Sequence, residues 1–253
     1  MKYLLLQNPG HNRVYYNAAD KLALAELEKR HQPSFLSNYK TAIIYESIDD
    51  YSKTAQFLEN ALTFKDDYQS KLKLAKAYQR LKKSQKAINI YEEVLSKDSL
   101  NLVLKYQLGK LYLTSKKGDK AITVFISLQS NDSLNANYSY QLGIAYALKN
   151  DRNRMINSFL DTYSKDSTHI RAVVRLATSF NKLKDKDSTQ IFVTKGLQLD
   201  STHIALNKLK INQLYRDKKY VDAIPFLLKL DTISKNDTYS TSMLGRTYYN
   251  LDS

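Results

Sequence analysis

A short motif, Leu-Gly with a tyrosine three residues after the glycine, recurs along this chain at a fixed interval. It stands at Leu108-Gly109 with Tyr112, at Leu142-Gly143 with Tyr146, and at Leu244-Gly245 with Tyr248. The first two copies lie 34 residues apart, and the third follows after three more such intervals. A constant period of this length is the signature of a repeat protein, in which each repeat is one small helical or stranded unit.

Weaker copies of the motif keep the same register, with alanine in place of glycine at Ala75 and Ala177. A second apolar series follows each copy by about a dozen residues, at Ala87 and Tyr91, Ala121 and Phe125, Met155 and Phe159, Thr189 and Val193, and Ala223 and Leu227. Spacings of three and four residues put side chains on one face of a helix. Each repeat is therefore predicted to be a pair of amphipathic helices.

The composition agrees with an all-α protein that has a substantial core. Of 253 residues only 6 are glycine and 3 proline, which leaves few of the turn residues that hairpins and barrels need. Apolar residues make up 43% of the chain, enough for a core. Four apolar residues precede Gln7, too few for a signal peptide or for the ~20 residues of a membrane span. We expect a soluble chain, and the absence of cysteine suits cytoplasm and periplasm equally.

These features resemble the tetratricopeptide-repeat family, which places Leu-Gly and Tyr on a first helix and small and aromatic residues on a second. The resemblance covers residues 34–253 as about six repeats, and it implies an α-solenoid, a right-handed superhelix of antiparallel helix pairs. Residues 1–33 do not keep the register, and we expect an irregular N-terminal helical segment there. The last repeat stops after its first helix, so we expect the chain to be a fragment of a longer array, with an exposed C-terminal repeat able to self-associate.

The turns and the degenerate repeats support further expectations. The stretch DSTHI occurs at Asp166–Ile170 and again at Asp200–Ile204, and its Asp, Ser and Thr are typical helix-start residues. The acidic doublets Asp49-Asp50, Asp66-Asp67 and Glu92-Glu93 are also interpreted as helix starts. The repeat that contains Lys210 lacks the Leu-Gly pair, and we expect that unit to be distorted or to adapt the curvature of the array.

The recurring glycines favour packing over phosphate binding. Phosphate-binding glycines cluster at a strand-to-helix turn, whereas Gly109 and Gly143 stand alone inside helical segments. A glycine there costs up to ~1 kcal/mol against alanine, and the alanines in register show that the position requires a small residue. We therefore expect the glycine to let two helices approach closely.

Candidate chemical groups do not assemble into a catalytic or metal site in the sequence. His169 and His203 occupy equivalent turns, roughly 10 Å apart by helix spacing, which is too far for one metal ion. No acid and base pair or nucleophile can be argued from the linear sequence. We expect a protein that is not an enzyme and that binds neither a cofactor nor a metal.

The chain is strongly basic, with 39 Lys and Arg against 25 Asp and Glu and a formal charge of +14. This charge predicts attraction to acidic proteins, nucleic acid or anionic lipid. Many lysines fall in helix ends and turns, where they can complement helix dipoles. The 20 tyrosines could stack nucleic-acid bases, but several of them hold packing positions of the repeat, so nucleic acid is not the expected partner.

The family resemblance also implies a binding surface, because the first helices of tetratricopeptide arrays line a concave groove that commonly binds extended peptides. By that resemblance the groove residues are Lys76, Tyr106, Lys110, Asn137, Tyr140, Gln141, Arg171, Val174, Arg175, Lys208 and Asn212. Some family members hold a peptide carboxylate in a clamp of Lys, Asn and Arg. In register with that clamp stand Tyr106 and Lys110, then Gln141, then Arg171 and Arg175, so the cationic third element is present and the first lysine is missing.

The sequence therefore predicts a non-enzymatic scaffold for protein–protein interaction, whose groove holds an extended peptide that is acidic or ends in a C-terminal carboxylate. Arginines spaced by four share a helix face and can grip carboxylates. A first alternative is a structural or assembly module, whose groove is filled by another copy or by the rest of a longer chain. A second alternative is non-specific binding of nucleic acid to the basic surface.

Overall fold

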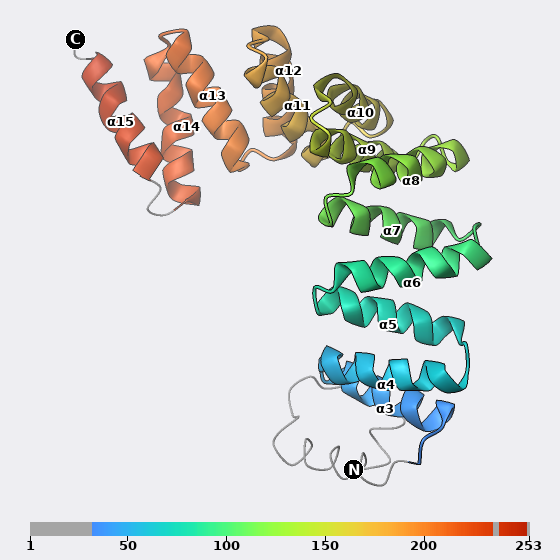
Figure 1. Cartoon of the computed structure of the whole chain (residues 1–253). Coiled ribbons are helices and arrows are strands. Elements are labelled where there is room, and N and C mark those ends of the chain that lie inside the picture. The colour runs from blue at the N-terminus through green and yellow to red at the C-terminus, as the bar shows by residue number, and fades with distance from the viewer. Residues whose placement is uncertain (1–31, 235–237, 252–253) are drawn as a thin grey trace. The chain divides into compact units, whose positions relative to one another are not determined.

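A computed structural model describes residues 32–234 and 238–251 of the chain. The N-terminal segment expected for residues 1–33 lies outside this described part, apart from its last two residues. All thirteen regular elements of the described residues are α-helices, labelled α3 to α15 in Figure 1. The all-α prediction is confirmed.

The helices form two compact units, residues 1–117 and residues 118–253. The described part of unit 1 holds α3 (Phe35–Ser47), α4 (Tyr51–Phe64), α5 (Tyr68–Arg80), α6 (Ser84–Lys97) and α7 (Leu102–Thr114). Unit 2 holds α8 (Gly118–Asn131), α9 (Ala136–Leu148), α10 (Arg152–Lys165), α11 (Ile170–Lys182), α12 (Lys186–Leu199), α13 (Ile204–Arg216), α14 (Tyr220–Ile233) and α15 (Thr238–Leu251). Within each unit, every helix packs against the next one along the chain.

The helix starts reproduce the predicted period. The odd-numbered helices begin at residues 35, 68, 102, 136, 170, 204 and 238, so the first step is 33 residues and each later step is 34. The helix that carries Lys210 keeps this spacing, because α13 is a regular 13-residue helix. Ile211, which replaces the glycine there, is fully buried. This repeat therefore keeps a regular first helix without the Leu-Gly pair.

A left-handed residue closes the first helix of each pair. It is Asp49, Lys82, Lys116, Asn150, Lys184 or Lys218, with φ between 56° and 61°. The amide that follows each of them bonds back to a carbonyl in the last turn, as the Lys83 N–H does to the Tyr78 oxygen at 2.8 Å. This back-bonded ending satisfies carbonyls that the helix leaves open. It explains why the turns inside the pairs have a constant length.

The turns between pairs differ from the expectation for DSTHI. The N-cap of α11 is His169, whose Nδ1 accepts the Ala172 N–H at 3.2 Å, and the N-cap of α13 is His203. Asp166 lies too far ahead of α11 to reach its first turn, so its carboxylate accepts the Thr168 N–H within the turn at 2.9 Å. The other correction concerns Glu92-Glu93, which lies inside α6 and not at a helix start.

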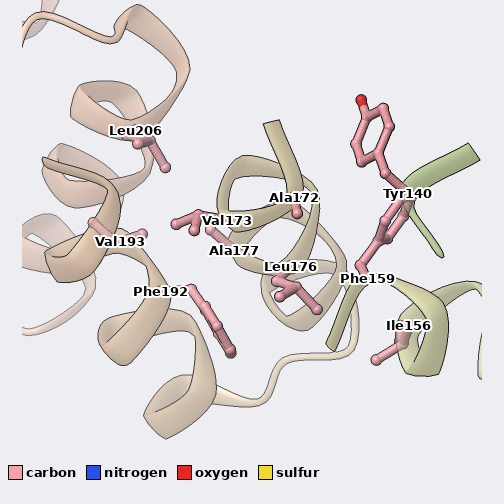
Figure 2. Packing of buried hydrophobic residues seen from close by; sticks show 10 residues of the cluster. All are labelled: Tyr140, Ile156, Phe159, Ala172, Val173, Leu176, Ala177, Phe192, Val193 and Leu206. Atoms are coloured by element: carbon pink, nitrogen blue, oxygen red, sulfur yellow. The ribbon is translucent and has the colours of Figure 1, made fainter. Parts of the chain in front are cut away.

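The core of unit 2 runs through successive helices, as Figure 2 shows. Phe159 of α10, Leu176 of α11 and Leu206 of α13 are almost completely shielded from solvent. Phe192 of α12 stacks on Phe180 of α11, with ring centroids 5.6 Å apart and the planes 7° from parallel. Burial of such side chains stabilises a repeat by ~1.5–3 kcal/mol each. The rigid core fixes where the exposed side chains of α9, α11 and α13 lie.

Candidate functional site

The predicted surface residues of unit 1 lie on α5 and α7. Lys76 is exposed on α5, with its Nζ 3.4 Å from Glu46 Oε1 of α3, and the other oxygen of that carboxylate accepts a bond from Lys73 at 2.7 Å. On α7, Lys110 holds its Nζ 5.6 Å from the ring centroid of Tyr106. A cation over an aromatic face is attracted by the ring. The lysine of the predicted clamp element is therefore held beside its own tyrosine.

The two arginines of α11 are the most prominent cationic pair of the predicted surface. Arg171 and Arg175 are exposed and one helical turn apart, and Val174 between them is half-buried. The Arg171 guanidinium carbon lies 4.9 Å from the centroid of the Tyr140 ring. An arginine stacked on an aromatic ring keeps its hydrogen-bond donors free while its position is restrained. This arrangement presents two guanidinium groups on one helix face.

Tyr140 itself differs from the expectation of an exposed contact residue. Its side chain is only 7% exposed and belongs to the buried cluster, with the ring 5.6 Å from Phe159 and 4.7 Å from His169. Figure 2 shows the hydroxyl group pointing away from the cluster. Tyr140 is therefore a core residue whose ring supports Arg171. Burial is the main reason that the pKa of the adjacent His169 is lowered, and the charge of Arg171 lowers it further.

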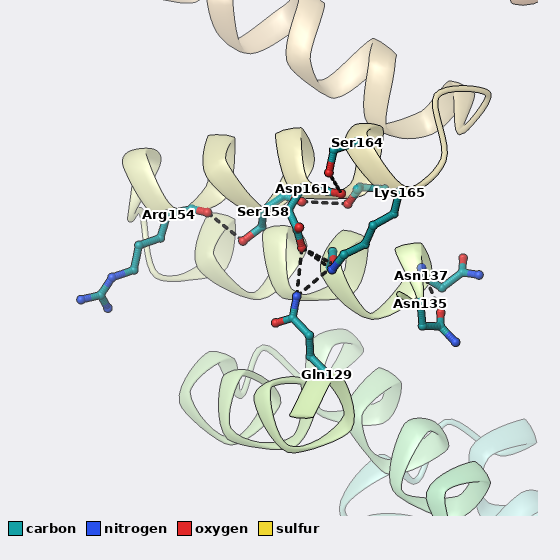
Figure 3. Close-up of polar contacts among 10 residues, drawn as sticks. Gln129, Asn135, Asn137, Arg154, Ser158, Asp161, Ser164 and Lys165 are labelled. Atoms are coloured by element: carbon teal, nitrogen blue, oxygen red, sulfur yellow. Dashed lines mark hydrogen bonds and ion pairs between the residues drawn. The ribbon is translucent and has the colours of Figure 1, made fainter. Parts of the chain in front are cut away.

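On α9, Asn137 is exposed and Gln141, one turn later, is half-buried. The backbone N–H of Asn137 donates to Asn135 Oδ1 at 3.1 Å, which fixes the start of the helix (Figure 3). The side-chain amide of Asn137 therefore projects from a capped first turn.

On α13, Lys208 and Asn212 meet a residue that the sequence analysis did not name. Tyr239 of α15 donates its hydroxyl to Asn212 Oδ1 at 2.9 Å, and Lys208 Nζ lies 4.8 Å from the Tyr239 ring centroid. Tyr239 stands 68 residues after Arg171 and 102 after Asn137, so it holds the same register position. Repeat register is the signal that could have found it.

A hollow of about 320 Å³ lies beside Arg175, in unit 2. Its apolar lining comes from Ile144, Met155 and Phe159, and its cations are Arg152, Arg175 and Lys182. The one acidic residue in the lining, Asp151, is engaged as the N-cap of α10, where it accepts the Arg154 N–H at 3.1 Å. Of the eleven predicted residues only Arg175 lines this hollow. An apolar floor with three cations around it suits an apolar group next to a negative charge.

A polar cluster holds α9 in place behind this surface, between α8 and α10. Figure 3 shows the bonds that converge on the Asp161 carboxylate. They come from Gln129 at 2.9 Å, Ser139 at 2.6 Å and Lys165 at 2.6 Å. Burial opposes ionisation of Asp161, but the bonds from Lys165 and Ser139 outweigh it and hold the pKa of this carboxyl below its ordinary value. The cluster connects three helices through one ionised group.

Two kinds of site were searched for in the described residues with a negative result. Within residues 32–234 and 238–251, no group of three or more His, Cys, Asp or Glu could hold a metal ion. Among the described helices, none is long and apolar enough to cross a membrane.

The comparisons with known proteins agree with the helix pairs and their period. A family model described as the tetratricopeptide repeat matches residues 69–99, which cover α5 and α6. The chain is a tetratricopeptide-repeat protein. The comparison with curated proteins gave no match.

Solved tetratricopeptide-repeat structures share the solenoid fold of this chain. The C-terminal part of a repeat-containing protein from Cytophaga hutchinsonii has a TM-score of 0.73 at 14% identity, over 96% of this chain and 97% of that one. MamA from Desulfovibrio magneticus RS-1 has a TM-score of 0.59 at 17% identity, over 67% and 96%. YrrB, described as a tetratricopeptide-repeat protein with an unusual peptide-binding site, has a TM-score of 0.57 at 14% identity, over 74% and 97%. At these identities the likeness shows the fold alone.

Proposed function

We propose that this chain is a non-enzymatic scaffold for protein–protein interaction, and that unit 2 binds an extended peptide through carboxylates. The observation that carries the proposal is the exposed pair Arg171 and Arg175 on one face of α11. Guanidinium groups bind carboxylates through two parallel hydrogen bonds, which gives both affinity and orientation. The formal charge of +14 adds attraction to an acidic partner.

The hollow beside Arg175 supports a peptide that combines a carboxylate with an apolar side chain. Arg175, Arg152 and Lys182 supply positive charge, while Ile144 and Met155 supply apolar surface. An apolar side chain buried there contributes through its area, and the neighbouring carboxylate contributes through charge-assisted hydrogen bonds. A C-terminal apolar residue carries both groups on one residue. YrrB, which shares the fold, is described as having a peptide-binding site.

The proposal is tested with a fluorescent octapeptide of alternating Glu and Leu that ends in a free carboxylate. We expect Arg171→Ala with Arg175→Ala to weaken its binding at least tenfold, which corresponds to ~1.4 kcal/mol. The matched control is Lys184→Ala with Lys186→Ala, which removes two charges from the exposed turn between α11 and α12 and should change binding less than twofold.

A second form of the peptide, with an amidated C-terminus, separates the two carboxylate sources. A large loss of affinity on amidation assigns the arginines to the C-terminal carboxylate, and no loss assigns them to acidic side chains. Unchanged peptide binding in the double arginine variant, at ~0.15 M salt, would show that the surface is assigned wrongly.

A second candidate function, assembly with another copy, is favoured by the exposed face of α15. Tyr248 is 52% and Tyr249 74% exposed, and a methyl group added at Gly245 would contact nothing within 4 Å. Exposed aromatic side chains that cluster on one helix commonly mark an interface. Sedimentation velocity over a concentration series tests this function. A concentration-dependent dimer that Tyr248→Ser with Tyr249→Ser abolishes supports it, and a monomer at every concentration contradicts it.

A further inference from the structure

Four lysines gather where the turn between α5 and α6 meets the turn that follows α7. Lys82, Lys83, Lys86 and Lys117 line an open hollow of about 670 Å³ in unit 1, together with Ser115 and the first residues of α6. The lining includes no acidic side chain. None of the residues of the proposed peptide surface lies in it. Like charges held together in this way repel one another, so the cluster needs a physical reason.

The position of Lys83 is unfavourable for a lysine. Lys83 is the N-cap of α6 and makes no side-chain capping bond. At the equivalent position α4, α10 and α12 have Asp50, Asp151 and Asp185, and each carboxylate accepts an N–H of the first turn. A missing cap costs about 1 kcal/mol, and a positive charge at the positive end of a helix dipole adds ~0.3–1 kcal/mol. Local helix physics therefore favours aspartate here.

The neighbouring lysines are not selected by local structure either. Lys82 holds φ at 57°, a left-handed conformation that costs a non-glycine residue about 1 kcal/mol. Lys117 reaches the first turn of α6 from the following repeat, where its Nζ donates to Gln85 Oε1 at 2.5 Å. Lys86 has Glu59 at 3.9 Å, but an exposed pair at that distance neutralises little of the cluster. The hollow keeps a net positive charge.

An unsatisfied hydroxyl lies in the same hollow. The Oγ atom of Ser115 is shielded from solvent and has no hydrogen-bond partner in the part of the chain that the structure describes. A buried hydroxyl without a partner costs about 1–3 kcal/mol, a cost that a bound acceptor would remove. Uncapped amides, four ammonium groups and a free hydroxyl are all hydrogen-bond donors. Departures from local rules that share one place are typical of a binding site.

We propose that this hollow binds a phosphate-bearing ligand that carries two or more negative charges, such as a diphosphate group. The amides at the start of α6 and the helix dipole favour a phosphate oxygen, as helix N-termini commonly do. Lysine binds phosphate as a point charge and does not need the planar geometry that a carboxylate offers to arginine. The ligand would offset the repulsion among the lysines and accept the bond that Ser115 lacks.

The test is isothermal titration of the full chain with inorganic pyrophosphate at ~0.15 M salt. Lys83→Asp restores the capping residue of the other repeats, so we expect it to raise the melting temperature and to weaken pyrophosphate binding at least tenfold. Lys82→Gln with Lys117→Gln, which keeps the N-cap lysine, should weaken binding by a similar factor. The control Lys184→Gln with Lys186→Gln lowers the net charge by the same two units in a turn that Asp185 already caps, and should stay within twofold.

The result also distinguishes a soluble ligand from a lipid headgroup. Vesicles of phosphatidylcholine with about 5 mol % phosphatidylinositol 4-phosphate supply the second source. Pyrophosphate binding without vesicle binding supports a soluble phosphate, and vesicle binding that pyrophosphate displaces supports a headgroup at the same hollow. Absence of pyrophosphate binding, vesicle binding that pyrophosphate leaves intact, or an equal loss in the control variant would overturn the proposal.

Discussion

A methyl group added to Gly143 of α9 would lie 2.5 Å from Cε1 of Phe159 on α10. No real carbon atoms pack that closely, so the two helices approach to a distance that only glycine allows. Phe159 cannot move aside easily, because its side chain is 1% exposed within the core of unit 2. The recurring Leu-Gly motif is therefore a packing element here, as the sequence analysis expected.

We predict that Gly143→Ala destabilises unit 2. Overpacking a core costs about 1–3 kcal/mol, and the better helix propensity of alanine returns at most ~1 kcal/mol. Thermal unfolding followed by circular dichroism measures the change as a lower melting temperature. A Gly143→Ala protein that is as stable as the original would show that Phe159 relaxes at no cost.

The same substitution at Gly245 should have the opposite effect. Gly245 holds the same register position in α15, and an added methyl group would contact nothing within 4 Å. Alanine should then raise stability by ~0.5–1 kcal/mol through helix propensity alone. The pair of variants separates packing from propensity, since the chemical change is identical.

Much of the fold was predictable because local rules and repeat packing agree. The 34-residue spacing of Gly109 and Gly143 gave the helix pairs, since it reflects contacts between neighbours along the chain. The histidine caps were not predictable in the same way. His169 caps α11 although aspartate, serine and threonine precede it, because only the last residue before the helix is placed to reach its first amides.

The Asp161 cluster predicts an acid-sensitive stability of unit 2. Because the pKa of Asp161 is held below its unfolded value of about 3.9, its contribution is complete above that pH and is lost as pH falls through the folded pKa. Asp161→Asn should therefore lower the melting temperature at pH 7, by about 1 kcal/mol or less for a partly exposed group. The difference from the original protein should shrink below pH 4.

The control for this variant is Asp217→Asn, which makes the same charge change at an exposed residue after α13. We expect its melting temperature to follow the original protein from pH 7 to pH 3. If Asp161→Asn and Asp217→Asn behave alike across that range, the bonds from Ser139 and Lys165 do not stabilise unit 2.

The candidate surface was less predictable than the fold, because register places a residue on a helix face but does not report its burial. Arg171 and Arg175 are exposed as expected, whereas the Tyr140 ring is buried against Phe159 and His169. Tyr239 was missed since its bond to Asn212 joins different repeats. The hollow around Lys83 was missed for another reason. Lysines in turns are usually solvated, and only the absent cap of α6 and the buried Ser115 hydroxyl distinguish these.

A repeated pair of tyrosine and glutamate predicts an alkaline limit to the stability of unit 1. Tyr78 of α5 donates its hydroxyl to Glu59 of α4, and Tyr112 of α7 donates to Glu92 of α6 at 2.5 Å. Burial raises the pKa of both tyrosines, and the adjacent carboxylates raise these pKa values further. Each hydroxyl therefore stabilises the folded state fully below the unfolded pKa of about 10, and this contribution is lost as pH rises through the folded pKa.

Tyr78→Phe with Tyr112→Phe should remove this dependence. We expect the melting temperature of the original protein to fall more steeply between about pH 9 and pH 11 than that of the double variant, because only the original must keep both hydroxyls protonated. Lysine titration affects both proteins equally and cancels in the comparison. The control Tyr248→Phe with Tyr249→Phe alters two exposed tyrosines of α15 and should leave the steep fall in place. Equal slopes for the original protein and the Tyr78→Phe, Tyr112→Phe variant would show that the two carboxylates do not stabilise the protonated tyrosines.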